Sequence, residues 1–135
     1  MRAAVLDSWA VLCYLRGEHD HRRIVDLLTA AAAGKAALSM SLVNFTEVLY
    51  SVERLWGRAK AEEIDRLLEG FPVEFVPVDK ELARAAAHFK ANNALALGDC
   101  YCAALAEQRQ AAVYTGDPEF KQLEKQLKIV WLRQG

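Results

Sequence analysis

Short apolar runs alternate along this chain with longer segments in which apolar residues recur every three or four positions. A strand buried on both faces of a parallel sheet has a short continuous apolar run, often rich in β-branched residues. Runs of this kind predict strands over residues 2–6, 36–40, 73–78, 111–114 and 129–132. Pro77 interrupts the third run, because proline cannot donate a ladder hydrogen bond.

Helical periodicity fills the segments between these runs. It predicts helices over residues 8–15, 20–33, 42–56, 59–68 and 100–107, and a further helix after Asp79. Asp7 or Ser8 can cap the first helix, and Asp79 can cap its own. Strands and helices thus alternate, which predicts an α/β fold. We expect a single domain over residues 1–135, with a short central parallel sheet of about four to five strands flanked by helices on both faces.

Composition is consistent with one soluble globular domain and limits the classes of partner that it is expected to bind. Of 135 residues, 53% are hydrophobic and 26% are charged, which is enough for a hydrophobic core. Lys and Arg number 17 against 18 Asp and Glu, so the net charge of -1 gives no polybasic signature for nucleic acid or membrane. The apolar stretch over residues 9–15 is shorter than the about 20 residues of a membrane span. We therefore expect a cytoplasmic protein with no membrane association.

The three cysteines are expected to be structural. Cys100 and Cys102 lie two residues apart on a predicted helix, so their side chains point about 200° apart and suit a shared metal ion poorly. An odd count in a protein without an export signal favours reduced cysteines in the core.

Four acidic residues carry the candidate chemistry: Asp7, Glu47, Asp99 and Asp117. Asp7 follows the first predicted strand and Asp117 follows the fourth, and ligands of open parallel sheets bind outside such carboxyl ends. Glu47 lies in the second turn of the helix leaving the second strand, and Asp99 begins the helix that leads to the fourth. Carboxylates gathered at one edge would repel each other strongly. The arrangement therefore predicts a hard divalent cation, Mg²⁺ or Mn²⁺.

Each acid also has an ordinary structural explanation. Asp7 and Asp99 could each cap a helix, and Asp117 stands in a Thr-Gly-Asp-Pro sequence typical of a turn. Glu47 lies opposite the apolar stripe of its helix, where a solvated surface residue would lie. The same polar side carries Asn44, Ser51 and Arg54. Only the joint placement of the four acids favours a site.

Four fragments surround these acids. They are Val5-Leu6-Asp7-Ser8, Val43-Asn44-Phe45-Thr46-Glu47-Val48, Leu97-Gly98-Asp99 followed by Cys100-Tyr101-Cys102-Ala103-Ala104-Leu105-Ala106, and Thr115-Gly116-Asp117-Pro118-Glu119-Phe120. In this order and spacing they resemble the PIN-domain family, in particular the VapC-type toxins of bacterial toxin–antitoxin pairs. The resemblance spans nearly the whole chain. The segment Cys-Tyr-Cys after Asp99 departs from many relatives, which affects packing more than chemistry.

The resemblance implies a metal-dependent endoribonuclease, the toxin of a type II toxin–antitoxin pair. Carried over by position, Asp7, Glu47 and Asp99 correspond to the central ligands of Mg²⁺ or Mn²⁺, and Asp117 to a fourth, more variable acid. In such a site the ion activates a water molecule that attacks the RNA phosphodiester, leaving 5′-phosphate and 3′-hydroxyl ends. Polar neighbours that orient the acids or the water correspond to Ser8, Asn44 and Thr115.

The resemblance also implies three partners: an RNA substrate, a cognate antitoxin protein and a second copy of the chain. The early helices carry more apolar surface than a small sheet needs. These residues are Leu12, Leu15, Ile24, Leu28, Val52 and Leu55. In VapC-like proteins such a groove receives an antitoxin helix, so we expect both antitoxin binding and homodimerisation.

Three alternatives stay open. A Mg²⁺-dependent phosphatase with an aspartyl nucleophile would carry a second Asp two residues after Asp7, where this chain has Trp9. A non-catalytic PIN-like module binding RNA or a partner is disfavoured by the presence of all four acids. An interaction domain with surface acids would tolerate Asp7→Asn and Asp99→Asn without loss of metal binding or RNA cleavage.

Overall fold

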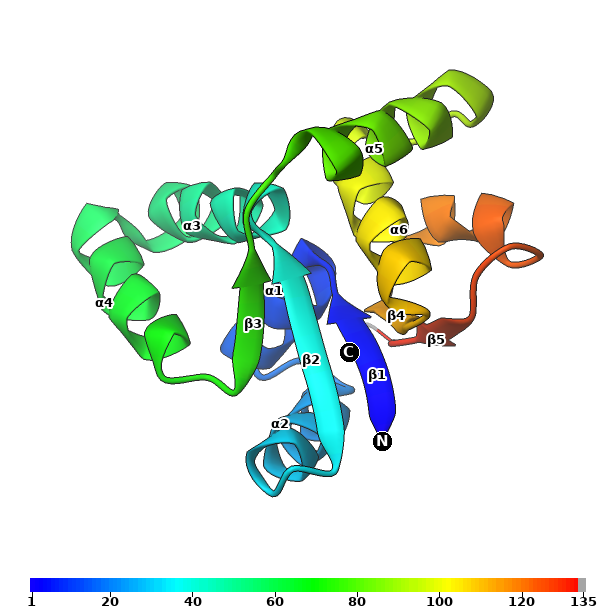
Figure 1. Cartoon of the computed structure of the whole chain (residues 1–135). Helices are drawn as coiled ribbons and strands as arrows, with labels where there is room; N and C mark the ends of the chain where they lie inside the picture. Colours follow the sequence, from blue (N-terminus) through cyan, green and yellow to red (C-terminus); the bar gives the residue numbers. More distant parts are fainter. Residues whose placement is uncertain (134–135) are drawn as a thin grey trace.

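The computed structural model describes residues 1–133 and contains a five-stranded parallel sheet (Figure 1). The strands are β1 Arg2–Leu6, β2 Ala36–Ser41, β3 Val73–Val76, β4 Ala112–Thr115 and β5 Ile129–Trp131. Their order in the sheet is β3-β2-β1-β4-β5, and every neighbouring pair is parallel. The predicted α/β fold is confirmed. The first strand is the central one, so its carboxyl end lies between those of β2 and β4.

Helices cover both faces of the sheet, as predicted. They are α1 Ser8–Arg16, α2 His21–Ala32, α3 Leu42–Trp56, α4 Arg58–Glu69, α5 Lys80–Asn92, α6 Leu97–Arg109 and the 3-10 helix η1 Pro118–Leu123. Helices α1 to α4 share one hydrophobic core with the sheet, whereas α5, α6 and η1 share the other. Figure 1 shows α3 and α4 to the left of the strands and α5 and α6 to the right.

Strand β1 shows how one short sequence supports both cores. Ala4 and Leu6 belong to the core under α1 to α4, while Ala3 and Val5 contact the core under α5 and α6. Successive side chains of a strand point to opposite faces. An unbroken apolar run therefore buries both faces of the sheet, as parallel sheets require.

Helix α6 is fixed at the end opposite to its acidic first turn. It packs between α5 and the strands β1, β2 and β4. In its last turn, Arg109 makes a two-pronged ion pair with Glu74 of β3, with N–O distances of 2.7 and 3.0 Å. Bidentate pairs of this kind orient both partners. The helix that carries Asp99 is thus held across the sheet.

Several boundaries differ from the sequence prediction, and one helix was not predicted. Strand β3 ends at Val76, before Pro77, and does not reach residue 78. Helix α6 begins at Leu97, so Asp99 lies inside its first turn and does not cap it. The helix η1, which was not predicted, follows Asp117, and Pro118 occupies its first position, where a missing N–H costs nothing.

The cysteines lie in the core, as predicted. Cys13, Cys100 and Cys102 are buried and free of disulfide bonds. Burial raises the pKa of all three thiols, which favours their protonated form. Within residues 1–133, no helix combines the length and the apolar character that crossing a membrane requires.

Candidate active site

Asp7 directly follows strand β1 and caps helix α1. Its Oδ1 accepts a hydrogen bond from the Ala10 N–H at 2.8 Å, and only 2% of the residue is exposed. The capping role is therefore correct, but it uses one carboxylate oxygen only. The other oxygen, Oδ2, accepts a hydrogen bond from the Thr115 hydroxyl of β4.

Thr115 connects Asp7 to the loop that carries Asp117. In the register of the sheet, Leu6 pairs with Tyr114, so the residues that follow them are neighbours. The buried hydroxyl of Thr115 donates to Asp7 and accepts a hydrogen bond from the Asp117 N–H at 3.0 Å. One hydroxyl thus orients the Asp7 carboxylate and fixes the start of the next acidic segment.

Glu47 of α3 reaches the first turn of α6. The fully buried Asn44 donates from Nδ2 to Glu47 Oε1 at 2.9 Å and to the Gly98 carbonyl at 3.1 Å. A Cβ atom at position 98 would lie 2.6 Å from Glu47 Cδ, so only glycine leaves room for this carboxylate. The helical wheel suggested a solvated side here, which is wrong for Asn44, because this side of α3 packs against α6.

Asp99 presents a carboxylate oxygen without a partner. The residue is 8% exposed, and its buried Oδ2 has no hydrogen-bond partner within residues 1–133. Leaving a buried polar atom unpaired costs free energy, so such an atom in a native site calls for an explanation. A bound cation would supply the missing partner.

Glu119 joins the acidic group and was missed as a site residue in the sequence. One carboxylate oxygen from each of Asp99, Asp117 and Glu119 lies within 4.8 Å of the others. Glu119 stands on η1, where its N–H donates to Asp117 Oδ1 at 3.0 Å. The only available signal was a second acid two residues after Asp117, on a turn that begins with proline.

Burial and mutual repulsion raise the pKa values of Asp7 and Asp99. Burial raises the pKa of Asp7 to about 7, against the opposing effect of its hydrogen bonds, and the charges of Asp117 and Glu47 add to the rise. Burial also raises the pKa of Asp99 to about 8, to which contact with Glu119 and the neighbouring acidic charges contribute. A divalent cation would reverse both effects by favouring the ionised carboxylates.

Trp9 occupies the position at which an aspartyl phosphatase would need its second acid. A Cβ atom at Gly116 would overlap the Trp9 ring, so the indole packs directly against the loop after β4. An indole ring has no carboxyl group and cannot act as a general acid or base. The structure therefore gives no support to aspartyl-phosphate chemistry.

The four predicted acids approach one another to different degrees. Asp99 and Asp117 share the tight cluster with Glu119, whereas Asp7 and Glu47 lie beside it, held by Thr115 and Asn44. The cluster offers carboxylate oxygens alone, the donor type that hard divalent cations prefer. Both this donor set and the unpaired oxygen of Asp99 fit a divalent cation.

The fold and the site together define a parallel α/β protein with an acidic centre at the carboxyl ends of its central strands. The chain belongs to the PIN-domain family, whose sequence model matches residues 4–126. No curated protein matches the chain in sequence.

Several solved structures have the same fold. VapBC2 from Rickettsia felis, bound to a DNA fragment from its promoter, has a TM-score of 0.74 and 15% identity, covering 97% of this chain and 99% of that one. DNA-bound VapBC from Salmonella typhimurium has a TM-score of 0.74 and 18% identity, with coverages of 96% and 98%. Mycobacterium tuberculosis VapC20, a sarcin-ricin loop cleaving toxin, has a TM-score of 0.67 and 15% identity, with coverages of 88% and 93%.

Proposed function

We propose that the protein is a metal-dependent endoribonuclease that serves as the toxin of a type II toxin–antitoxin pair. The observation that carries the proposal is the carboxylate cluster at the ends of the central strands, with the buried, unpaired oxygen of Asp99. Membership of the PIN family and the fold shared with VapC toxins support it. The free cysteines suit the reducing cytoplasm, which we propose as its location.

The proposed ion is Mg²⁺ or Mn²⁺, held by Asp99, Asp117 and Glu119, with Asp7 and Glu47 beside it. When bound, such an ion would promote attack of water on the phosphodiester and stabilise charge on the phosphate oxygens. No side chain need form a covalent intermediate. The expected products carry 5′-phosphate and 3′-hydroxyl ends.

The surrounding residues hold the acids in place for this chemistry. Thr115 fixes the rotation of the Asp7 carboxylate, and Asn44 holds Glu47 against the first turn of α6. Preorganised ligands bind a cation without first having to give up conformational freedom. These two polar residues therefore contribute to the affinity of the site for metal.

The exposed side of α3 beyond Glu47 is the proposed contact for RNA. The Arg54 guanidinium lies 4.8 Å from the centroid of the Tyr50 ring, and Tyr50 is 46% exposed. With a rise of 1.5 Å per residue, Arg54 lies about 10 Å along the helix from Glu47. An aromatic ring can stack on a base and a guanidinium can bind a phosphate without reading the sequence.

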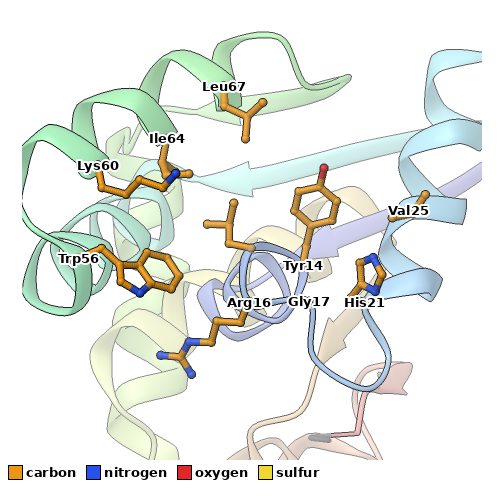
Figure 2. A pocket seen from close by; sticks show the side chains of 10 residues that line it. Tyr14, Arg16, Gly17, His21, Val25, Trp56, Lys60, Ile64 and Leu67 are labelled. Atoms are coloured by element: carbon orange, nitrogen blue, oxygen red, sulfur yellow. The ribbon is translucent and has the colours of Figure 1, made fainter.

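A groove lined by α1, α2, α4 and the end of α3 is the proposed antitoxin site. It encloses about 760 Å³, and Figure 2 shows Trp56, Ile64 and Leu67 on one side and Tyr14, His21 and Val25 on the other. Arg16 and Lys60 bring positive charge to the same groove. The apolar lining fits the apolar face of a partner helix whose flanking residues are acidic. The solved complexes of fold relatives with their antitoxins support this partner.

Of the six apolar residues expected to form this groove, only Leu15 lines it. Leu12 and Leu28 pack against the core, and Leu55 is 51% exposed but does not line the groove. Ile24 and Val52 are 1% and 0% exposed and belong to the core. Their helix faces point at the sheet, so they cannot contact a partner. Sequence periodicity marks the buried face of a helix but does not say what covers it.

Homodimerisation stays a prediction. Leu42, Val78 and Leu97 are 36%, 42% and 57% exposed, and each follows the carboxyl end of a strand or opens α6. We propose that a second copy covers this apolar rim of the site. Light scattering of Leu97→Asp, compared with wild type, would reveal a monomer if the rim forms the interface.

The function is tested with purified protein, free of antitoxin, and end-labelled single-stranded and hairpin RNAs. Cleavage is expected with Mn²⁺, with loss on addition of EDTA and in Asp7→Ala and Asp99→Asn. Asp26→Asn is the matched control, because Asp26 is an exposed acid of α2 paired with Arg22 at 3.3 Å. Cleavage that persists in Asp99→Asn, or no Mn²⁺-dependent cleavage of any RNA, would count against the proposal.

A further inference from the structure

Gln122 ties together the two segments that carry the acidic cluster. Its Oε1 accepts a hydrogen bond from the Ala94 N–H at 3.0 Å, and its Nε2 donates to the Ala94 carbonyl at 3.1 Å. The same Nε2 lies 3.3 Å from the carbonyl oxygen of Glu119. One side-chain amide thus satisfies both backbone groups of a residue 28 positions away, as a neighbouring strand would.

Ala94 lies in the segment that joins α5 to α6. This segment leads at Leu97 into the helical turn that carries Asp99. On the α5 side, Lys90 Nζ donates to the Leu95 carbonyl at 2.5 Å. On the other side, Gln122 supplies the contact from η1. The segment before Asp99 is therefore held from two directions.

The positions of the acids on either side of this contact suggest its role. Asp117 and Glu119 precede Gln122 on its own segment, and Asp99 follows Ala94 within the first turn of α6. We propose that Gln122 is a positioning residue of the metal centre, whose amide keeps Asp99 within reach of Asp117 and Glu119. The inference rests on the proposed metal-dependent function.

Gln122 affects the affinity of the site for metal and not the rate of the chemical step. Gln122 is exposed and contributes no carboxylate, so its removal leaves every ligand in the chain. Removal does take away the hydrogen bonds between η1 and the segment before α6. Residues that orient metal ligands typically change metal affinity 10- to 100-fold when they are replaced. Gln122→Met, which keeps the length but has no amide, is expected to weaken Mn²⁺ binding about 10-fold.

The test is a Mn²⁺ titration by calorimetry, together with the rate of RNA cleavage as a function of Mn²⁺ concentration. For Gln122→Met, both curves should shift to higher concentration by the same factor, and the rate should reach the wild-type plateau. Gln122→Asn keeps the amide but is one methylene too short, so its two curves should also shift to higher Mn²⁺ concentration. Gln126→Met is the control, since this exposed glutamine lines a cavity with Arg2 and Lys128 at the amino end of the sheet.

Each remaining outcome is decisive. Equal Mn²⁺ affinity in Gln122→Met and wild type overturns the positioning role and leaves the proposed function intact. An equal loss in Gln126→Met, or a plateau that stays low at saturating Mn²⁺, also overturns it. A wild-type protein that binds no Mn²⁺ overturns both proposals. Thermal unfolding in EDTA verifies that each variant is folded at the temperature of the titration.

Discussion

The carboxylate of Glu47 packs against Gly98 at a separation that no other residue type at position 98 would permit. A Cβ atom there would lie 2.6 Å from Cδ and 2.7 Å from Oε1 of Glu47. Asn44 strengthens the contact by donating a hydrogen bond to both residues. The glycine thus lets an acid from α3 reach the first turn of α6.

Gly98→Ala is expected to keep the fold and lose activity. The added methyl group meets the far end of a flexible side chain, which can rotate away with little loss of stability. Because small misplacements of a catalytic group are costly, the cleavage rate should fall about 100-fold. The cleavage rate measures the loss of activity, and the melting temperature measures any loss of stability. Gly70→Ala is the control, since its Cβ would meet Leu67 O at an ordinary 3.5 Å, and an unchanged rate in Gly98→Ala would contradict the prediction.

The metal-free protein is expected to lose stability as the pH rises from about 5 to about 8. Folding raises the pKa of Asp7 from 3.8 to about 7 and that of Asp99 to about 8, so the folded state binds protons more tightly than the unfolded state. The stabilisation is complete below the unfolded pKa and is lost as the pH rises through the folded pKa. Melting temperatures in EDTA across this range measure the loss.

Asp7→Asn should remove part of this pH dependence. At pH 8 it should raise the free energy of unfolding by about 1 to 2 kcal/mol, and with it the melting temperature by several degrees. Asparagine keeps the helix-capping oxygen and carries no charge. Mn²⁺ added at pH 8 should stabilise the wild type more than the variant. A melting temperature in EDTA that is flat or rises between pH 5 and pH 8 contradicts the pKa assignment.

Thr115→Val should impair the site more than Thr115→Ser. Valine has the same shape but neither donates to Asp7 nor accepts from the Asp117 N–H. The cleavage rate of the valine variant should fall about 10-fold or more, because the Asp7 carboxylate is no longer oriented. Serine keeps the hydroxyl and should stay within a few-fold of wild type. Equal rates in the two variants would show that the hydroxyl is unimportant.

Tyr50→Ala and Arg54→Ala should raise KM for single-stranded RNA and leave kcat near the wild-type value. Loss of base stacking costs about 1 to 3 kcal/mol, so a rise in KM of about 10-fold is expected for Tyr50→Ala. The KM of the Arg54 variant should also rise less steeply with salt concentration. Arg22→Ala is the control, as Arg22 lies on α2 in an exposed pair with Asp26. A fall in kcat at unchanged KM would place these residues in the chemical step.

The fold was predictable because its signals are local. Each strand is a short apolar run, and each of the first three runs is followed by a segment with helical spacing. The start of α6 was misplaced because Ala96, at its N-cap, makes no side-chain hydrogen bond to the helix. No capping residue therefore marks the boundary in the sequence.

The site was predictable only in outline, because its details depend on contacts between distant elements. A helical wheel cannot distinguish solvent from a neighbouring helix, so it could not show that Asn44 is buried between α3 and α6. Glu119 is an exposed acid on a short helix, and nothing local separates it from other surface acids. Nothing local marks Gln122 either, since its hydrogen-bond partner Ala94 is 28 residues away.

The hydrogen bond from Thr115 to Asp7 joins residues 108 positions apart, across neighbouring parallel strands. A ribosome makes Asp7 first, and Thr115, which completes its surroundings, only 108 positions later. Until β4 pairs with β1, Asp7 is not held next to the segment that carries Asp117. A protein proposed to cut RNA therefore cannot assemble its site before β4 has been made and has paired with β1.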